Sequence, residues 1–194
     1  MRSRRMTRAF TPTPVDPAVI DELVDLAARA PSAGKTQGWH LLALEGVETA
    51  RFWDITLPPD RRATFRWRDL LDAPVILLPF ADAPAYVDRY AEPDKSSTGL
   101  GTGIDAWPAP YWTIDASMAV MTLLLGAEAF GLGALLFGVF RSETELRAEL
   151  GVPEHLQLLG AIALGHPAEA PSARGRSADR PRRRVAEIVH RSRW

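Results

Sequence analysis

The chain has 194 residues, of which 46% are hydrophobic, and a formal net charge of −1. This composition suits one globular domain with a sizeable core. The absence of cysteine excludes disulfides, thiolate nucleophiles and cysteine-ligated metals. The basic start MRSRRMTR is followed by TPTPVDP instead of an apolar segment, so we see no secretory signal and expect a cytoplasmic protein that does not enter a membrane.

Basic residues gather at the two ends of the chain. Twelve of the 23 lysines and arginines lie in residues 2–8 and 174–193, whereas the remainder carries 11 basic and 22 acidic residues. Basic ends on an acidic body indicate that both termini meet an anion. A compact phosphate suits clustered guanidinium groups. Nucleic acid is an alternative, but both ends lack lysine and any known groove-docking motif. Solvated arms are the remaining alternative.

The first predicted helix follows an extended, proline-rich connector. Asp16 is placed as its N-cap and Pro17 as its first residue. Apolar residues at helical spacing carry the helix to about Arg29. Before the connector, Phe10 is the first residue that we expect in the core. A strand is predicted at residues 40–44.

Residues 30–39, APSAGKTQGW, form a loop rich in small residues and hydrogen-bond donors. Gly34, Lys35 and Thr36 match only the end of the phosphate-loop pattern G-x-x-x-x-G-K-[ST]. The loop also follows a helix and precedes a strand, which is the reverse of the order that a phosphate loop needs. We therefore exclude a nucleotide triphosphatase. At the end of the loop, Trp39 is interpreted as a packing residue.

The middle of the chain combines apolar runs with many chain-breaking residues. A helix is predicted at residues 64–71 and a buried strand at 75–80, where an apolar run is bounded by prolines. Prolines and glycines then punctuate residues 83–110. Segments of this length without regular structure are usually lids, binding loops or disordered, so we expect a lid, with plain disorder as the alternative.

Residues 116–130 are apolar on nearly every side, and Glu128 is their only charge. A helix of this kind is buried. Asp115 and Ser117 stand at its predicted entrance, and Gly131 is a stop signal at its exit. A chain of this size has little room to bury a helix on all faces, so we expect a homodimer with this helix at its centre. The core helix of a monomer is the alternative.

The last third of the chain is predicted to add strands, a short helix and a tail. Strands are expected at residues 134–140 and 156–164, and a helix at 142–150. Residues 168–180 are small and polar, so they are interpreted as a linker. Apolar residues in the tail argue against a free nucleic-acid arm; these are Val185, Ile188, Val189 and Trp194.

Several motifs along the chain occur together in one known family. RRMTRAF, APSAGKTQGW, DAPVILL, GLG, LGHP and the arginine cluster ending in EIVHRSRW appear in the order of the FMN-dependent nitroreductase family, which the chain resembles over nearly its whole length. The resemblance implies an α+β fold: a three-layer sandwich with a mixed central sheet flanked by helices. It also implies a single domain, 1–194, in an intertwined homodimer around the central helix. Residues 83–110 would border the substrate pocket, and residues 168–194 would reach the partner subunit.

The chemistry implied by the resemblance is two-electron transfer in a ping-pong cycle. NADH or NADPH reduces FMN, and FMN reduces a nitroaromatic, a quinone or a related small-molecule acceptor. The flavin carries this chemistry, so we expect no catalytic side chain and no metal, and we interpret the scattered histidines as structural. Alternatives on the same fold are dehalogenation, unsaturated-bond reduction and flavin fragmentation. Alternatives of another class are a flavin-binding protein without turnover and a nucleic-acid-binding module.

The resemblance also assigns arginines at both ends to the flavin. Arg4 matches a phosphate partner, and Arg8 matches a position at the N1/O2 edge of the flavin, where a cation favours the anionic reduced form. Met6 stands where the family usually has serine. The other cofactor-binding candidates in these segments are Arg5, Arg182 and Arg183.

Two further segments match flavin contacts of the family. One is the loop that touches the flavin from the partner chain, with candidates Pro31, Ser32, Ala33, Lys35 and Gln37. The other is the end of a strand that lies along the isoalloxazine, with candidates Leu136, Phe137 and Gly138. Gly138 suits a close approach of the backbone, although an ordinary turn glycine is the alternative. Asp115 is expected either to face the flavin edge or to cap its helix.

Overall fold

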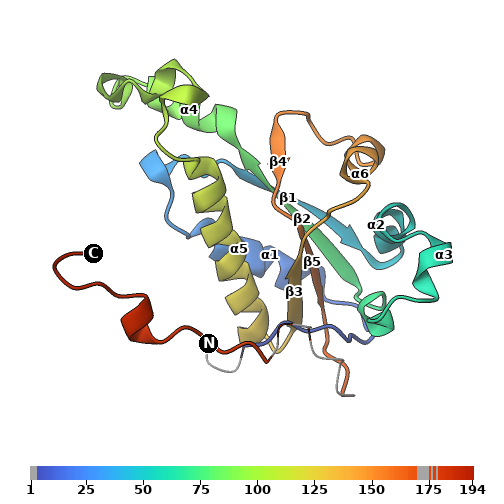
Figure 1. Ribbon diagram of the computed structural model, residues 1–194. Helices are drawn as coiled ribbons and strands as arrows, with labels where there is room; N and C mark the ends of the chain where they lie inside the picture. Colours follow the sequence, from blue (N-terminus) through green and yellow to red (C-terminus); the bar gives the residue numbers. More distant parts are fainter. Residues whose placement is uncertain (1–3, 170–174, 176, 178) are drawn as a thin grey trace.

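Figure 1 shows the computed structural model, which describes residues 4–169, 175, 177 and 179–194. Its helices are α1 (Pro17–Ala28), α2 (Thr49–Thr56), α3 (Pro59–Arg62), α4 (Ala83–Ala91), α5 (Tyr111–Ala129) and α6 (Glu143–Glu149). Its strands are β1 (Trp39–Glu45), β2 (Val75–Asp82), β3 (Gly133–Phe137), β4 (Leu156–Leu158) and β5 (Ala161–Gly165). Short 3₁₀ turns connect several of these elements.

The helix α1 begins where the sequence predicts. The Asp16 carboxylate accepts a hydrogen bond from the backbone N–H of Ala18 at 2.9 Å, and Pro17 is the first helical residue. One N–H of the first turn is thereby satisfied, and proline has none to satisfy. The apolar residues at helical spacing face the core; those that are buried are Ile20, Leu23 and Ala27.

The sheet has the strand order β1-β2-β5-β3, and β4 pairs with the end of β2. Every strand pairing in the described part of the chain is antiparallel, so the expectation of a mixed central sheet is wrong for this chain. The connection between the first two strands shows why. The N–H of Gly46, just after β1, donates to the carbonyl of Pro74, just before β2, at 2.8 Å. The chain therefore returns to the end of β1 that it has left, and β2 runs back along it.

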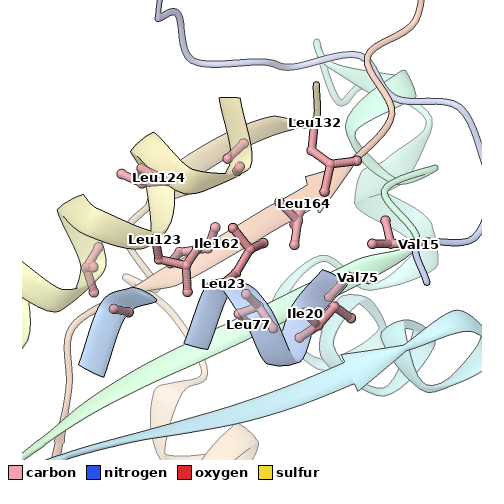
Figure 2. Packing of buried hydrophobic residues seen from close by; sticks show 14 of the residues in the cluster. Val15, Ile20, Leu23, Val75, Leu77, Leu123, Leu124, Leu132, Ile162 and Leu164 are labelled. Carbon is pink, nitrogen blue, oxygen red and sulfur yellow. The ribbon is translucent and has the colours of Figure 1, made fainter. Parts of the chain in front are cut away.

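The buried strand β2 separates two hydrophobic layers. Val75 and Leu77 pack into one core cluster, whereas Ile76 and Leu78 pack into the other, because successive side chains of a strand point to opposite faces. α1 and α5 cover the first face, and α2 and α6 cover the second (Figure 1). Figure 2 shows the packing of the first face. The predicted three-layer α+β arrangement is confirmed.

The central helix α5 packs tightly against α1 on one side. At Gly126 an added Cβ would lie 2.8 Å from Cδ2 of Leu23, so the two backbones approach closely there. The helix starts at Tyr111, about one turn earlier than predicted, and Asp115 therefore lies inside it instead of at its entrance. Within the described residues no helix is both long and apolar enough to cross a membrane.

The other side of α5 is not covered by the described residues of this chain. Several apolar side chains there are between 38% and 45% exposed; they are Tyr111, Ile114, Met121 and the adjoining Phe130. One chain therefore buries the helix on one face only. The described residues of the single chain thus do not enclose the helix on all sides, as the alternative of a monomer's core helix would require.

The predicted helix at residues 64–71 is wrong. The structure has only a 3₁₀ turn there, Arg68–Leu70. Phe65, Trp67 and Leu70 all line the same cavity. Residues two apart on an α-helix face different directions, so an irregular backbone is needed to turn Phe65 and Trp67 to the same side.

Residues 83–110 are more regular than predicted. They form α4 and three 3₁₀ turns, at 96–98, 100–102 and 104–106. Asp82 caps α4 by accepting from the N–H of Ala85 at 3.1 Å, and Pro84 lies in the first turn. Asp82 was not identified as a helix cap from the sequence, so α4 was not predicted. The helix is anchored by Tyr86, whose side chain is fully buried.

The C-terminal third departs from prediction only in detail. β3 ends at Phe137, short of residue 140, and the run at 156–164 is divided into β4 and β5 by Gly160, whose φ is +135°. The predicted helix at 142–150 is confirmed by α6. Part of the predicted linker at 168–180, and Arg2, Arg174 and Arg176 of the basic ends, lie outside the described residues.

Candidate functional site

Loop 31–37, which contains the 3₁₀ turn Ala33–Lys35, is a compact turn. Lys35 and Gln37 have φ of +56° and +53°, which few residues other than glycine adopt. Gln37 holds the turn closed, because its N–H donates to Ser32 Oγ at 2.8 Å and its side-chain amide donates to the carbonyl of Ala28 at 2.9 Å. Pro31, Lys35 and Gln37 are exposed on the outer side of the loop.

A buried polar group connects this loop to α4 and α5. Asp115 Oδ2 accepts from the N–H of Ala33 at 2.7 Å and from the hydroxyl of Tyr86 at 2.8 Å. Burial, together with the Asp115 carboxylate, raises the pKa of the Tyr86 phenol far above its ordinary value. Asp115 therefore does not cap its helix, and its carboxylate binds the loop. The only signal for this role in the sequence is an acidic residue at the start of an apolar run.

The N-terminal segment lies along the edge strand β3. The N–H of Thr7 donates to the carbonyl of Ala134 at 3.0 Å. Arg8 lies with its guanidinium carbon 5.7 Å from the centre of the Trp67 ring, and it donates to the carbonyl of Met6 at 3.2 Å. Arg4 donates to the sulfur of Met6 at 3.5 Å. Met6 thus contacts Arg4 and Arg8, two of the arginines predicted to bind the flavin.

Arg4 and Arg5 line a small cavity of about 190 Å³ beside β3. Glu128 lines the same cavity, so both positively and negatively charged side chains border it. The C-terminal segment comes near this region at Gly175, where an added Cβ would lie 2.9 Å from Arg8 Nη2. The C-terminal segment therefore meets the N-terminal segment at Arg8, which with Arg4 and Arg5 forms the predicted N-terminal flavin-binding group, called the flavin box below.

The predicted C-terminal arginines lie apart from that box. Arg182 and Arg183 are exposed in the tail, and Arg183 donates to the carbonyl of Glu187. Among the described contacts of this chain, neither arginine reaches Arg4 or Arg8. A phosphate clamp built from both ends is thus not assembled by the described contacts within one chain.

A larger cavity, of about 360 Å³, opens at the end of β3. Its aromatic walls are Phe52, Trp53, Phe65, Trp67, Phe137 and Phe140. Gly138 also lines it, whereas Leu136 is half-buried and packs against the core of the first sheet face. Trp53 and Phe137 are stacked, with ring centres 6.0 Å apart and planes 2° from parallel.

The aromatic cavity suits a flat ring system. Its walls are parallel and edge-on aromatic rings. The indole N–H of Trp53 is buried with no hydrogen-bond partner among the described residues. Gly138 lets the Phe140 ring pack against its backbone, because an added Cβ would lie 2.3 Å from Phe140 Cζ. Sequence reasoning missed Trp53 and Trp67, which are separated from β3 along the chain. The described residues hold no cluster of three metal-binding side chains.

Comparison with known proteins agrees with this arrangement. The model of the nitroreductase family matches residues 1–166. A protein named NADH dehydrogenase from Thermus thermophilus is 31% identical over 86% of this chain and 84% of its own length. FMN reductase [NAD(P)H] from Bacillus subtilis is 25% identical over 98% of this chain and 71% of its own length.

A solved structure shares the fold. A nitroreductase-like protein from Streptococcus mutans superposes with a TM-score of 0.74 at 16% identity, covering 96% of this chain and 93% of that one. The matched order of motifs, the three-layer architecture and the family model lead to one conclusion. The chain belongs to the nitroreductase family.

Proposed function

We propose that this protein reduces nitroaromatic, quinone or related small-molecule acceptors in a ping-pong cycle. As a member of the nitroreductase family, it is an NAD(P)H-dependent oxidoreductase with FMN as its cofactor. Bound FMN would supply the two-electron transfer, and the protein would supply position and electrostatics. The observation that carries the proposal is the aromatic cavity at the end of β3, beside which Trp67 holds the guanidinium of Arg8.

The aromatic cavity and the arginines of the flavin box supply the apolar walls and the positive charge that a phosphorylated flavin needs. Phe137 and Gly138 would lie along the ring system, with the aromatic side chains excluding water around it. Arg8 would face the N1/O2 edge and stabilise the negative charge that develops there. The phosphate would bind at the cations, which are Arg4, Arg5, Arg182 and Arg183.

A homodimer would complete the site. The exposed apolar face of α5 supports this part of the proposal, since such a face is typical of a surface that a partner covers. Loop 31–37 would then contact the flavin of the second subunit, and residues 168–194 would carry Arg182 and Arg183 across. The segment 83–110 would border the substrate pocket through its contacts with the loop. A single domain over residues 1–194 and a cytoplasmic location remain predictions.

The visible absorption spectrum of the purified protein tests the flavin. We expect a yellow protein, or one that takes up added FMN, and bleaching of its flavin band by NADH or NADPH without any acceptor. Reoxidation by members of an acceptor panel should then identify the second substrate. Nitroaromatics and quinones should be reduced faster than halogenated or unsaturated compounds. A colourless protein that takes up no FMN would overturn the proposal.

A further inference from the structure

Loop 31–37 is held by a buried carboxylate that the proposed flavin contacts do not use. Asp115 is only 5% exposed, and it has no cationic partner among the ion pairs of the described residues. A buried charge of this kind is costly unless strong hydrogen bonds stabilise it. One of its oxygens, Oδ2, accepts from both Ala33 N–H and the Tyr86 hydroxyl. The carboxylate thus holds the loop backbone to α5.

The outer side of the same loop is held by α4. Arg89 Nε donates to the carbonyl of Gly34 at 2.9 Å, and two oxygens of Asp94 hold the Arg89 guanidinium at 2.7 and 2.8 Å. The ring of Tyr90 closes the remaining space, since an added Cβ on Gly34 would lie 2.8 Å from Tyr90 Cε2. The loop is therefore fixed from both sides before any ligand binds.

We propose that Asp115 is a positioning residue that presets loop 31–37 for flavin binding. The inference rests on the proposed function, in which this loop contacts the FMN of the second subunit. A loop that is already ordered loses less conformational freedom when the ligand binds, so its affinity is higher. Because Asp115 lies on α5, it also ties the flavin loop to the helix that carries the exposed apolar face. The segment 83–110 then acts as a support for the loop through Arg89 and Tyr90.

Two substitutions at Asp115 separate its hydrogen bonds from its charge. Asp115→Ala removes both contacts, and we expect the FMN dissociation constant of the full-length protein to rise about tenfold or more. Asp115→Asn keeps an oxygen acceptor without the charge, and we expect the dissociation constant to stay within about threefold of wild type. The measurement is a titration with FMN, followed by flavin fluorescence and visible circular dichroism. Turnover per bound flavin should be unchanged at saturating FMN.

A remote variant controls for a simple loss of stability. Thr49 is also a buried polar residue, and its hydroxyl donates to the carbonyl of Gly46 at 2.9 Å, at the opposite end of β1 from the loop. Thr49→Val should lower the melting temperature without changing FMN affinity. If Asp115→Ala does not fold, Arg89→Met gives the same test from the exposed side of the loop. It should raise the dissociation constant severalfold at a near-normal melting temperature.

The results distinguish a failure of the positioning role of Asp115 from a failure of the proposed function. If wild type binds FMN and the Asp115→Ala and Arg89→Met variants bind it equally well, the positioning role is overturned while the proposed function stands. The role is also overturned if Thr49→Val loses as much affinity as Asp115→Ala at the same melting temperature. If wild type binds no FMN, the proposed function is overturned, and this inference with it.

Discussion

The guanidinium carbon of Arg8 lies 5.7 Å from the centre of the Trp67 ring, and Arg66 lies over the same ring at 5.6 Å. Trp67 therefore lies within cation–π distance of two cations at the mouth of the aromatic cavity that it lines. These three residues come from two segments that are distant along the chain. The positive charge beside the cavity therefore depends on the fold, which brings the two segments together.

The first prediction concerns the reduction potential of the bound flavin. Arg8→Ala should make it more negative, because the cation that favours the anionic reduced form is lost. A loss of about 1.4 kcal/mol corresponds to about 30 mV for a two-electron couple. Spectroelectrochemical titration measures the shift. Arg61→Ala, which removes an exposed arginine of α3, is the matched control and should leave the potential unchanged. An unaltered potential in Arg8→Ala would remove Arg8 from its proposed role.

The second prediction concerns assembly. Met121 is 41% exposed on the uncovered face of α5, so Met121→Glu should place a charge inside the proposed subunit interface and produce monomers. Light scattering after size-exclusion chromatography measures the mass. Val47→Glu changes an apolar side chain that is 87% exposed outside α5, and it should leave the dimer intact. A wild-type monomer, or a Met121→Glu dimer, would contradict the proposed interface.

The third prediction concerns alkaline pH. The pKa of Tyr86 is raised above its ordinary value of 10.0, mainly by burial. The folded state then retains a proton that the unfolded state loses, so the free energy of unfolding falls as the pH rises above about 10. Below that pH the phenol is protonated in both states and makes no pH-dependent contribution. Tyr86→Phe should therefore show a shallower fall between about pH 10 and 12 in urea unfolding experiments.

Tyr111→Phe is the control for that measurement, since it removes a tyrosine outside the Asp115 network. It should retain the wild-type slope. Equal slopes for Tyr86→Phe and wild type would show that the buried phenol does not titrate with folding.

The sequence by itself determined the features that depend on near neighbours. Asp16 and Pro17 start α1 because a cap and a fixed φ act within one turn. The apolar run from Val75 became the central strand because burial on both faces leaves no polar position. The family was also predictable, since each of its motifs is a contiguous stretch of sequence.

Only the tertiary structure decided which residues support the site. Ala33 and Asp115 are 82 positions apart, and no local pattern predicts a hydrogen bond across that distance. Phe65 and Trp67 lie in an irregular segment instead of the predicted helix and line a cavity with Phe137. The buried Tyr86 anchors α4 in a segment that was predicted to lack regular structure. In the last two cases the packing of large side chains outweighs local backbone preference. The contacts that decide these positions exist only after the chain has folded.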